Sequence, residues 1–114
     1  MNKINNKNVY ETIFIITPVL SEIQYYDIIK EYEIFLKKNN VEIRHKEFWG
    51  LKSLSYSIQN KQNGWYFLIE YHSKPELIFN FELKLKNDER IIRFLTVKLN
   101  KHAINYVQKK RQKK

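Results

Sequence analysis

The first structured segment of the chain reads Val9-Tyr-Glu-Thr-Ile-Phe-Ile-Ile-Thr17 and is followed by Pro18. Because β-branched and aromatic residues dominate it, the segment predicts a strand. Ser21-Glu-Ile-Gln24 then has the spacing of a capping box, which predicts that a helix begins there. The helix should end at Lys37–Asn40. Its apolar stripe is expected to comprise Ile23, Tyr26, Ile28 or Ile29, Tyr32, Phe35 and Leu36.

The middle of the chain predicts two further strands. Residues 41–48 alternate loosely and read as a second strand, which Trp49-Gly50 interrupts as a bend or bulge. Residues 51–58 continue extended, with Leu54, Tyr56 and Ile58 on one side. A turn is expected at 60–64 and a third strand at 65–72.

The last part of the chain predicts a helix and a fourth strand. Ser73-Lys-Pro-Glu76 repeats the capping-box spacing and places proline in the first turn. A helical stripe, a loop at 87–90 and a strand at 91–99 follow. The order βαββαβ predicts an α+β, ferredoxin-like plait: a four-stranded antiparallel sheet with two helices on one face. The expected domain is 9–99, between a polar extension (1–8) and a basic C-terminal tail (100–114).

Positive charge is concentrated at the C-terminal end. The 114 residues carry a net charge of +9, and from Lys98 onward there are seven Lys or Arg residues and no Asp or Glu. Such a block favours a polyanionic partner, nucleic acid above all. A solvated tail that aids solubility remains the alternative.

The sequence lacks the residue types that several classes of function require. The chain has no Cys and only two Gly, and its three His (His45, His72, His102) are far apart. It therefore offers no thiolate site, no metal-ligand spacing and no glycine-rich phosphate loop. We expect no enzyme activity, cofactor, metal or small-molecule substrate. No apolar run is long enough to span a membrane and the N-terminus is polar, so we expect a cytoplasmic protein without membrane contact.

One face of the predicted sheet is unusually apolar. Side chains alternate between faces along each strand. Glu11, Glu70 and Arg93 mark the face that the helices leave open, since burying an unpaired charge is costly. The same face also carries six apolar side chains, which predict a protein-partner surface. They are Ile13, Ile15, Tyr66, Leu68, Leu95 and Val97.

The stretch Trp49–Ile58 resembles a known family, the sixth protein of the bacterial small ribosomal subunit. That family's pattern G-x-[KR]-x-L-x-Y-x-I is met by Gly50, Lys52, Leu54, Tyr56 and Ile58. Tyr10-Glu11, Gly64-Trp-Tyr-Phe, Arg93 and Lys101-His-Ala103 match in the same order, so the resemblance covers residues 9–104. A departure is Ser57, where the family commonly has proline.

The resemblance implies a structural, non-catalytic protein of the small-subunit platform. It implies binding to the central domain of small-subunit ribosomal RNA and a heterodimer with the eighteenth small-subunit protein. Basic residues near the strand ends and in the tail are the candidate RNA contacts: Arg44, Lys46, Lys52, Arg93, Lys98, Lys101, Lys109, Lys110 and Arg111. Two alternatives stay open, namely that Lys52 is a solvated bulge residue and that Arg93 pairs with Glu11 within the sheet.

An RNA-recognition motif that binds single-stranded RNA is the second hypothesis. Residues 63–70 match its third-strand signature at Gly64, Trp65, Phe67 and roughly Leu68, and they fail at Asn63, Tyr66 and Glu70. In that motif Phe14, Trp65 and Phe67 would point outward to stack on bases. The ribosomal hypothesis turns Phe14 and Phe67 inward. A dimeric plait that binds a small ligand on its sheet is a third class, although it would not explain the basic tail.

Overall fold

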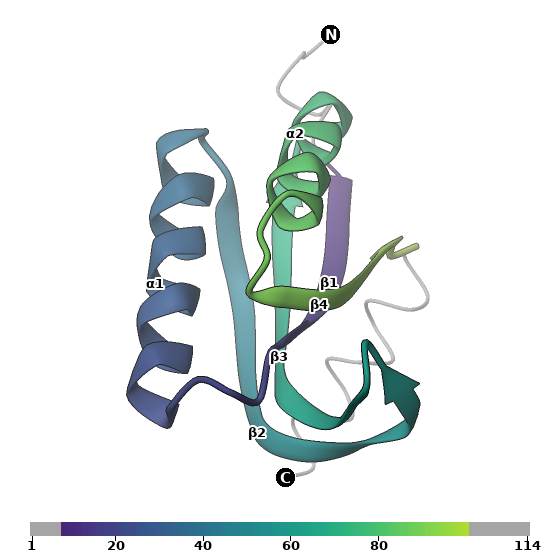
Figure 1. Ribbon diagram of the computed structural model, residues 1–114. Helices are drawn as coiled ribbons and strands as arrows, with labels where there is room; N and C mark the ends of the chain where they lie inside the picture. The colour runs from purple at the N-terminus through teal and green to yellow at the C-terminus, as the bar shows by residue number, and fades with distance from the viewer. Residues whose placement is uncertain (1–7, 101–114) are drawn as a thin grey trace, which may run out of the picture.

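The computed structural model describes residues 8–100. The elements follow in the order β1 (Asn8–Ile16), α1 (Glu22–Lys38), β2 (Glu42–Ile58), β3 (Lys61–Ser73), α2 (Pro75–Lys86) and β4 (Ile91–Lys98). All strand pairs are antiparallel, and the sheet order is β2-β3-β1-β4. Both helices cover the same side of the sheet (Figure 1). The predicted ferredoxin-like plait is therefore confirmed.

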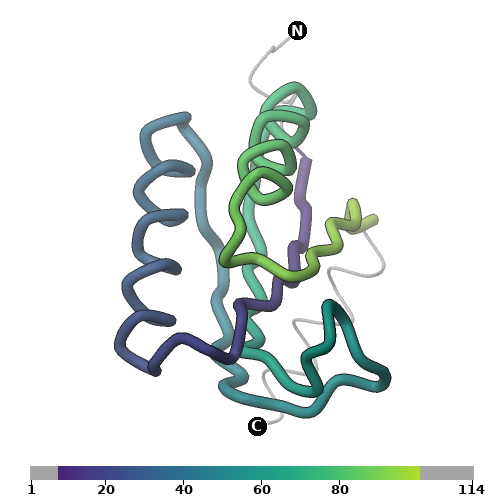
Figure 2. The backbone as a smooth tube through the Cα atoms, in the orientation of Figure 1, coloured from purple at the N-terminus to yellow at the C-terminus, as the bar shows by residue number. Residues whose placement is uncertain are grey.

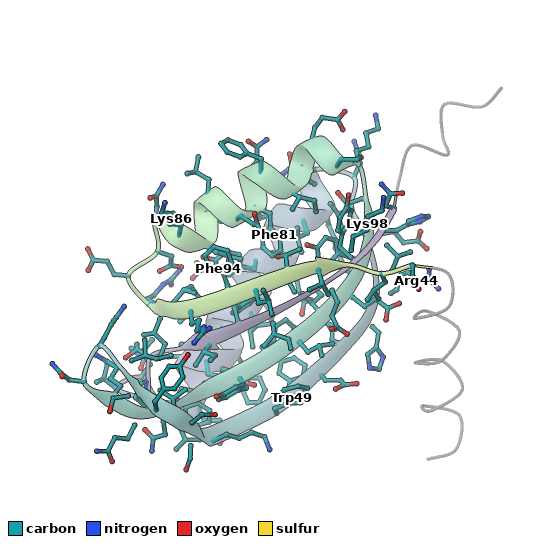
Figure 3. The ribbon with its side chains drawn as sticks, turned by 90° about the vertical axis from the view of Figure 1, so that its right-hand side faces the viewer. Arg44, Trp49, Phe81, Lys86, Phe94 and Lys98 are labelled. Atoms are coloured by element: carbon teal, nitrogen blue, oxygen red, sulfur yellow. The ribbon has the colours of Figure 1, made fainter. Side chains whose placement is uncertain are left out.

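The core lies between the sheet and the helices. Phe14 of β1 and Phe67 of β3 are fully buried, and their ring centroids are 5.3 Å apart. Tyr32 of α1 packs on Phe14 at 5.4 Å. Phe81 of α2 and Phe94 of β4 lie between that helix and the sheet (Figure 3). The inward set of each strand is thus the one that its alternation predicted.

Helix α1 begins as predicted, but its first turn buries a different residue. The Oγ of Ser21 accepts a hydrogen bond from the Gln24 N–H, and the Gln24 side chain accepts one from the Ser21 N–H, so the capping box is complete. The prediction that Ile23 and Tyr26 belong to the buried stripe was wrong, because they are 73% and 45% exposed. Tyr25 is buried instead, where its ring stacks on Trp65.

The β2–β3 hairpin contains the expected bulge but turns earlier than predicted. Gly50 has a φ of 78°, and the register with β3 shifts between Phe48 and Gly50. The predicted turn at residues 60–64 was wrong: Gln59 and Asn60 form a two-residue turn with positive φ, and β3 begins at Lys61. Both residues adopt the left-handed conformation that tight hairpin turns of this type require.

Helix α2 begins one residue later than the capping-box prediction implied. Ser73 stays in β3, where it pairs with Asn8, and its Oγ donates to the carbonyl of Lys74 rather than capping the helix. Lys74 is the N-cap and makes no side-chain cap. The fixed φ of Pro75 suits the first helical position, and its missing N–H costs nothing there.

A polar network ties α1 to the loop before β4. The Tyr32 hydroxyl donates to Asp88 at 2.6 Å, and Arg90 donates to both oxygens of Asp88 and to Glu31. Burial raises the pKa of Asp88, but the hydrogen bonds from Arg90 and Tyr32 outweigh it and lower that pKa from 3.8 to about 2. The loop that positions β4 is thus held by a charged carboxylate.

Candidate functional site

The structure brings the six apolar residues predicted for a partner surface together on the sheet face opposite the helices. Ile13 lies directly between Leu68 of β3 and Leu95 of β4, and Ile15 lies beside Tyr66. Val97 completes the set at the end of β4. Leu95 and Val97 are exposed by 61% and 40%, whereas Ile15 and Leu68 are buried within the chain itself. The face therefore has two exposed apolar side chains along β4. Beside them, on β1 and β3, lie apolar side chains that the rest of the chain covers.

The outer half of the β2–β3 hairpin, residues 51–64, covers part of this face and is here named the arm. The bulge at Gly50 redirects the chain, and the arm turns out of the sheet and across toward β4 (Figure 2). A groove of about 340 Å³ lies where the arm faces β1 and β4. Its lining is Ile13, Ile15, Leu54, Ser55, Tyr56, Ile58, Tyr66, Arg93, Phe94 and Leu95. Leu54, Tyr56 and Ile58 thus line the same groove, in keeping with their predicted common side.

Arg93 closes the arm onto β4. Its Nη1 donates a hydrogen bond to the Tyr56 hydroxyl at 2.7 Å, and its guanidinium lies 5.8 Å from the centre of the Tyr56 ring. The bond to Tyr56 raises the pKa of Arg93. The expected pairing of Arg93 with Glu11 does not match the sheet register, in which Arg93 lies opposite Ile15 and Glu11 lies opposite Val97. Contact of Arg93 with RNA stays a prediction. Among residues 8–100, the groove lining carries this one cation and no carboxylate.

Glu70 marks the open face as predicted, yet it is not exposed. Its side chain is 3% exposed, and Nε of Arg44 lies 3.6 Å from its Oε2. A carboxylate can be buried in this way because a guanidinium beside it compensates for lost hydration. Arg44, a predicted RNA contact, is therefore also the ion-pair partner of Glu70.

The other predicted RNA contacts are spread over the fold. Lys46 points to the helix side, where its Nζ lies 3.1 Å from Glu33 of α1. Lys52 of the arm and Lys98 at the end of β4 are exposed, and neither has a recorded partner among residues 8–100. Arg44 and Lys98 lie at the same end of the sheet (Figure 3). Lys101, Lys109, Lys110 and Arg111 fall outside the described residues.

Tyr25 and Trp49 shape the arm through contacts that were not predicted from the sequence. The Tyr25 hydroxyl donates to the carbonyl of Tyr66 and accepts from the N–H of Gly50, so it holds the bulge. Trp49 stacks on Tyr66 with ring centroids 6.2 Å apart, and its indole N–H donates to Glu47. Periodicity alone does not reveal these roles, because each depends on a partner distant in sequence or on the bulge itself.

The residues that would stack bases in an RNA-recognition motif point the wrong way. Phe14 and Phe67 are buried against the helices. Trp65 stacks on Tyr25 of α1 and donates its indole N–H to the Leu20 carbonyl. The second hypothesis required all three rings on the open face, so the structure contradicts it.

In the part of the chain that the structure describes, no three His, Asp or Glu side chains lie close enough to share a metal ion. No described helix is both long and apolar enough to cross a membrane.

Comparison with known proteins gives a consistent result. A family model described as "Ribosomal protein S6" matches residues 9–98. The small ribosomal subunit protein bS6 of Flavobacterium johnsoniae is 46% identical over 106 residues, covering 93% of this chain and 94% of that protein. The bS6 protein of Phocaeicola vulgatus is 45% identical over 107 residues, with 94% of each covered. The crystal structure of the 30S ribosomal protein S6 from Thermotoga maritima has a TM-score of 0.79 at 20% identity, covering 93% of this chain and 96% of that one, and it supports the fold.

Proposed function

The chain belongs to the ribosomal protein S6 family, and from this premise we propose that it binds the central domain of small-subunit ribosomal RNA as a heterodimer with the eighteenth small-subunit protein. The family's members are structural components of the small ribosomal subunit, so the chain is a ribosomal protein rather than an enzyme. Its place of action under this proposal is the ribosome, in the cytoplasm.

The observation that carries the heterodimer is the apolar face opposite the helices. Leu95 and Val97 are exposed side by side along β4, next to a groove whose floor is Ile13 and Ile15. A solvated face of an antiparallel sheet is ordinarily more polar. Since a contiguous exposed apolar strip is typical of a protein interface, this face supports docking of a protein rather than of RNA.

Exposed cations support the RNA contact. Lys52 and Lys98 present exposed ammonium groups on the arm and at the end of β4. Arg44 is half-exposed beside Glu70, so part of its guanidinium can reach a phosphate. The basic C-terminal tail adds Lys101, Lys109, Lys110 and Arg111. Contacts of this kind position a protein on RNA without reading bases, and RNA shape supplies selectivity.

A filter-binding titration tests the proposal. The full chain is titrated on a central-domain rRNA fragment and on single-stranded oligonucleotides, with and without the eighteenth protein, at several salt concentrations. We expect tight binding to the folded fragment, dependence on the protein partner, and an affinity that falls steeply with salt. Equal binding to single strands, with no effect of the partner, would overturn the proposal.

A further inference from the structure

The groove between the arm and β4 has apolar side chains at its floor and one positive charge, Arg93, among its described lining residues. We propose that an extended segment of the protein partner inserts an apolar side chain into the groove and sets a carboxylate against Arg93. This inference rests on the proposed heterodimer and specifies its chemistry. It also reassigns Arg93 from a predicted RNA contact to the protein interface.

The guanidinium of Arg93 has donors to spare. It carries five N–H groups in a planar fork, and within the described chain the recorded hydrogen bond uses Nη1 alone. The side chain stands at the exposed rim of the groove. A carboxylate can therefore take two parallel N–H donors, the geometry in which arginine binds carboxylates most strongly. Tyr56 need not leave for this to happen.

The charge around the groove favours an acidic segment. None of the lining residues that the structure describes is Asp or Glu, so an incoming carboxylate meets attraction from Arg93 and no repulsion from these residues. A basic segment would meet the opposite balance. Because like charges placed against each other at an interface repel, Arg93 selects for an acidic segment as well as stabilising it.

The floor favours a protein segment over a nucleotide chain. Five of the lining residues carry branched aliphatic side chains, whereas RNA-binding sheets present rings on which bases stack. The three rings of the lining are already engaged, because Tyr56 is bonded to Arg93, Tyr66 is stacked on Trp49 and Phe94 packs against the core. The aliphatic residues are Ile13, Ile15, Leu54, Ile58 and Leu95. A volume of about 340 Å³ lies at the small end of ligand pockets, enough for one or two side chains. A single cation also cannot follow a run of phosphates.

Tyr56 acts as a positioning residue for Arg93. The hydrogen bond of 2.7 Å holds the guanidinium and the arm in one arrangement before the partner arrives. A side chain that is already ordered loses less conformational freedom on binding, which strengthens the complex. Removing the hydroxyl should therefore weaken the preference for a carboxylate even if the ring remains.

Peptides from the partner provide the test. Overlapping synthetic peptides that span the eighteenth protein are titrated against the full chain by fluorescence anisotropy, and each binding peptide with an Asp or Glu is compared with its Asn or Gln version. For the wild type we expect the amide version to bind about tenfold more weakly, the loss of one charge-assisted hydrogen bond. In Arg93→Met the two versions should bind equally. In Tyr56→Phe the preference should fall to a few-fold.

Lys86→Met is the matched control, because it removes an equally exposed positive charge from α2, away from the groove (Figure 3). It should keep the full preference for the carboxylate. Thermal unfolding of each variant verifies that it is folded. If Arg93→Met retains the tenfold preference, or if no binding peptide shows one, the inference is overturned.

The outcomes separate this inference from the proposed function. If the intact eighteenth protein fails to bind the wild-type chain, the proposed function falls and the inference falls with it. If it binds but no peptide shows an Arg93-dependent preference, only the inference is wrong. A third outcome is that Arg93→Met leaves peptide affinities unchanged yet weakens rRNA binding more than Lys86→Met does. Arg93 then contacts RNA and not the protein partner, and the inference is overturned.

Discussion

The phenol oxygen of Tyr25 accepts a hydrogen bond from the backbone N–H of Gly50 at 3.3 Å, and this contact joins the first turn of α1 to the bulge in β2. The same hydroxyl donates to the Tyr66 carbonyl at 2.5 Å. Burial raises the pKa of Tyr25. The arm leaves the sheet at Gly50. Tyr25, which is buried on the helix side, therefore fixes the direction in which the arm extends over the opposite face.

Tyr25→Phe should therefore destabilise the fold. The substitution keeps the ring but leaves the part-buried Gly50 N–H and Tyr66 carbonyl without this partner, at a total cost of about 1–3 kcal/mol. Urea unfolding measures the change in the free energy of unfolding. Tyr26→Phe is the control, because Tyr26 is exposed and its hydroxyl makes one long hydrogen bond within residues 8–100, to Glu22 at 3.5 Å. Equal effects of the two substitutions would contradict the role of Tyr25.

The two glycines should respond differently to alanine. At Gly50 a methyl group meets open space, so only the positive φ of 78° opposes it, at a cost of about 1–2 kcal/mol. At Gly64 a Cβ would overlap the Cγ2 of Ile15 and approach the carbonyl oxygen of Ile16. Gly64→Ala should displace Ile15 in the groove floor and weaken partner binding as well as stability. Isothermal titration with the eighteenth protein tests this, and full affinity in Gly64→Ala would refute it.

Asp88 should give the stability a dependence on pH in the acid range. Its pKa is about 2 in the folded chain against an ordinary value of 3.8, so the carboxylate stabilises the fold above pH 3.8 and this contribution is lost as the pH falls toward 2. Asp88→Asn should cost about 1–2 kcal/mol at pH 7, allowing for partial solvent screening, and little at pH 2.

Urea unfolding of Asp88→Asn and wild type at both pH values measures this difference. Asp27→Asn, on the exposed side of α1, serves as the control and should change the free energy of unfolding little at either pH. The interpretation fails if the loss in Asp88→Asn is as large at pH 2 as at pH 7.

Lys52 and Lys98 should contribute to RNA affinity through phosphates alone. Lys52→Ala and Lys98→Ala are each expected to weaken binding of the heterodimer to the rRNA fragment and to lower the slope of log affinity against log salt by about one. Lys86→Ala removes the same charge from α2 and should leave the slope unchanged. A slope that stays constant in both Lys52→Ala and Lys98→Ala would place the RNA contacts elsewhere in the chain.

Local signals predicted most of the fold, and tertiary contacts account for part of what was missed. The Ser21–Gln24 capping box depends only on neighbouring residues, and it was confirmed in detail. Tyr25 lies three, four and seven residues before the buried Ile28, Ile29 and Tyr32, so the helical period itself includes Tyr25 in the buried stripe, and the choice of Ile23 and Tyr26 was the error. The contacts of Tyr25 with Trp65 and Gly50 are what periodicity does not predict. Gly64 was interpreted as part of a turn. Its lack of a side chain instead leaves room for Ile15, which packs against it.

The residues that share the open face of the sheet were predictable from the sequence, but the contacts that they make there were not. Alternation along β1, β3 and β4 correctly separated Ile13 and Ile15 from Phe14 and Ile16. It could not show that Glu70 is buried beside Arg44, or that the arm folds over the face and joins Tyr56 to Arg93. Both features follow from bulges in β2, whose effect on direction is not encoded in a two-residue period.

The most direct test of the central claim is hydrogen exchange of the full chain, followed residue by residue with and without the eighteenth protein. If the partner docks on the face opposite the helices, exchange should slow in β4 (Ile91–Lys98) and in the arm (51–64), while α2 (Pro75–Lys86) stays unchanged. Protection confined to the helices, or none in β4 and the arm when the complex is saturated, would contradict the account.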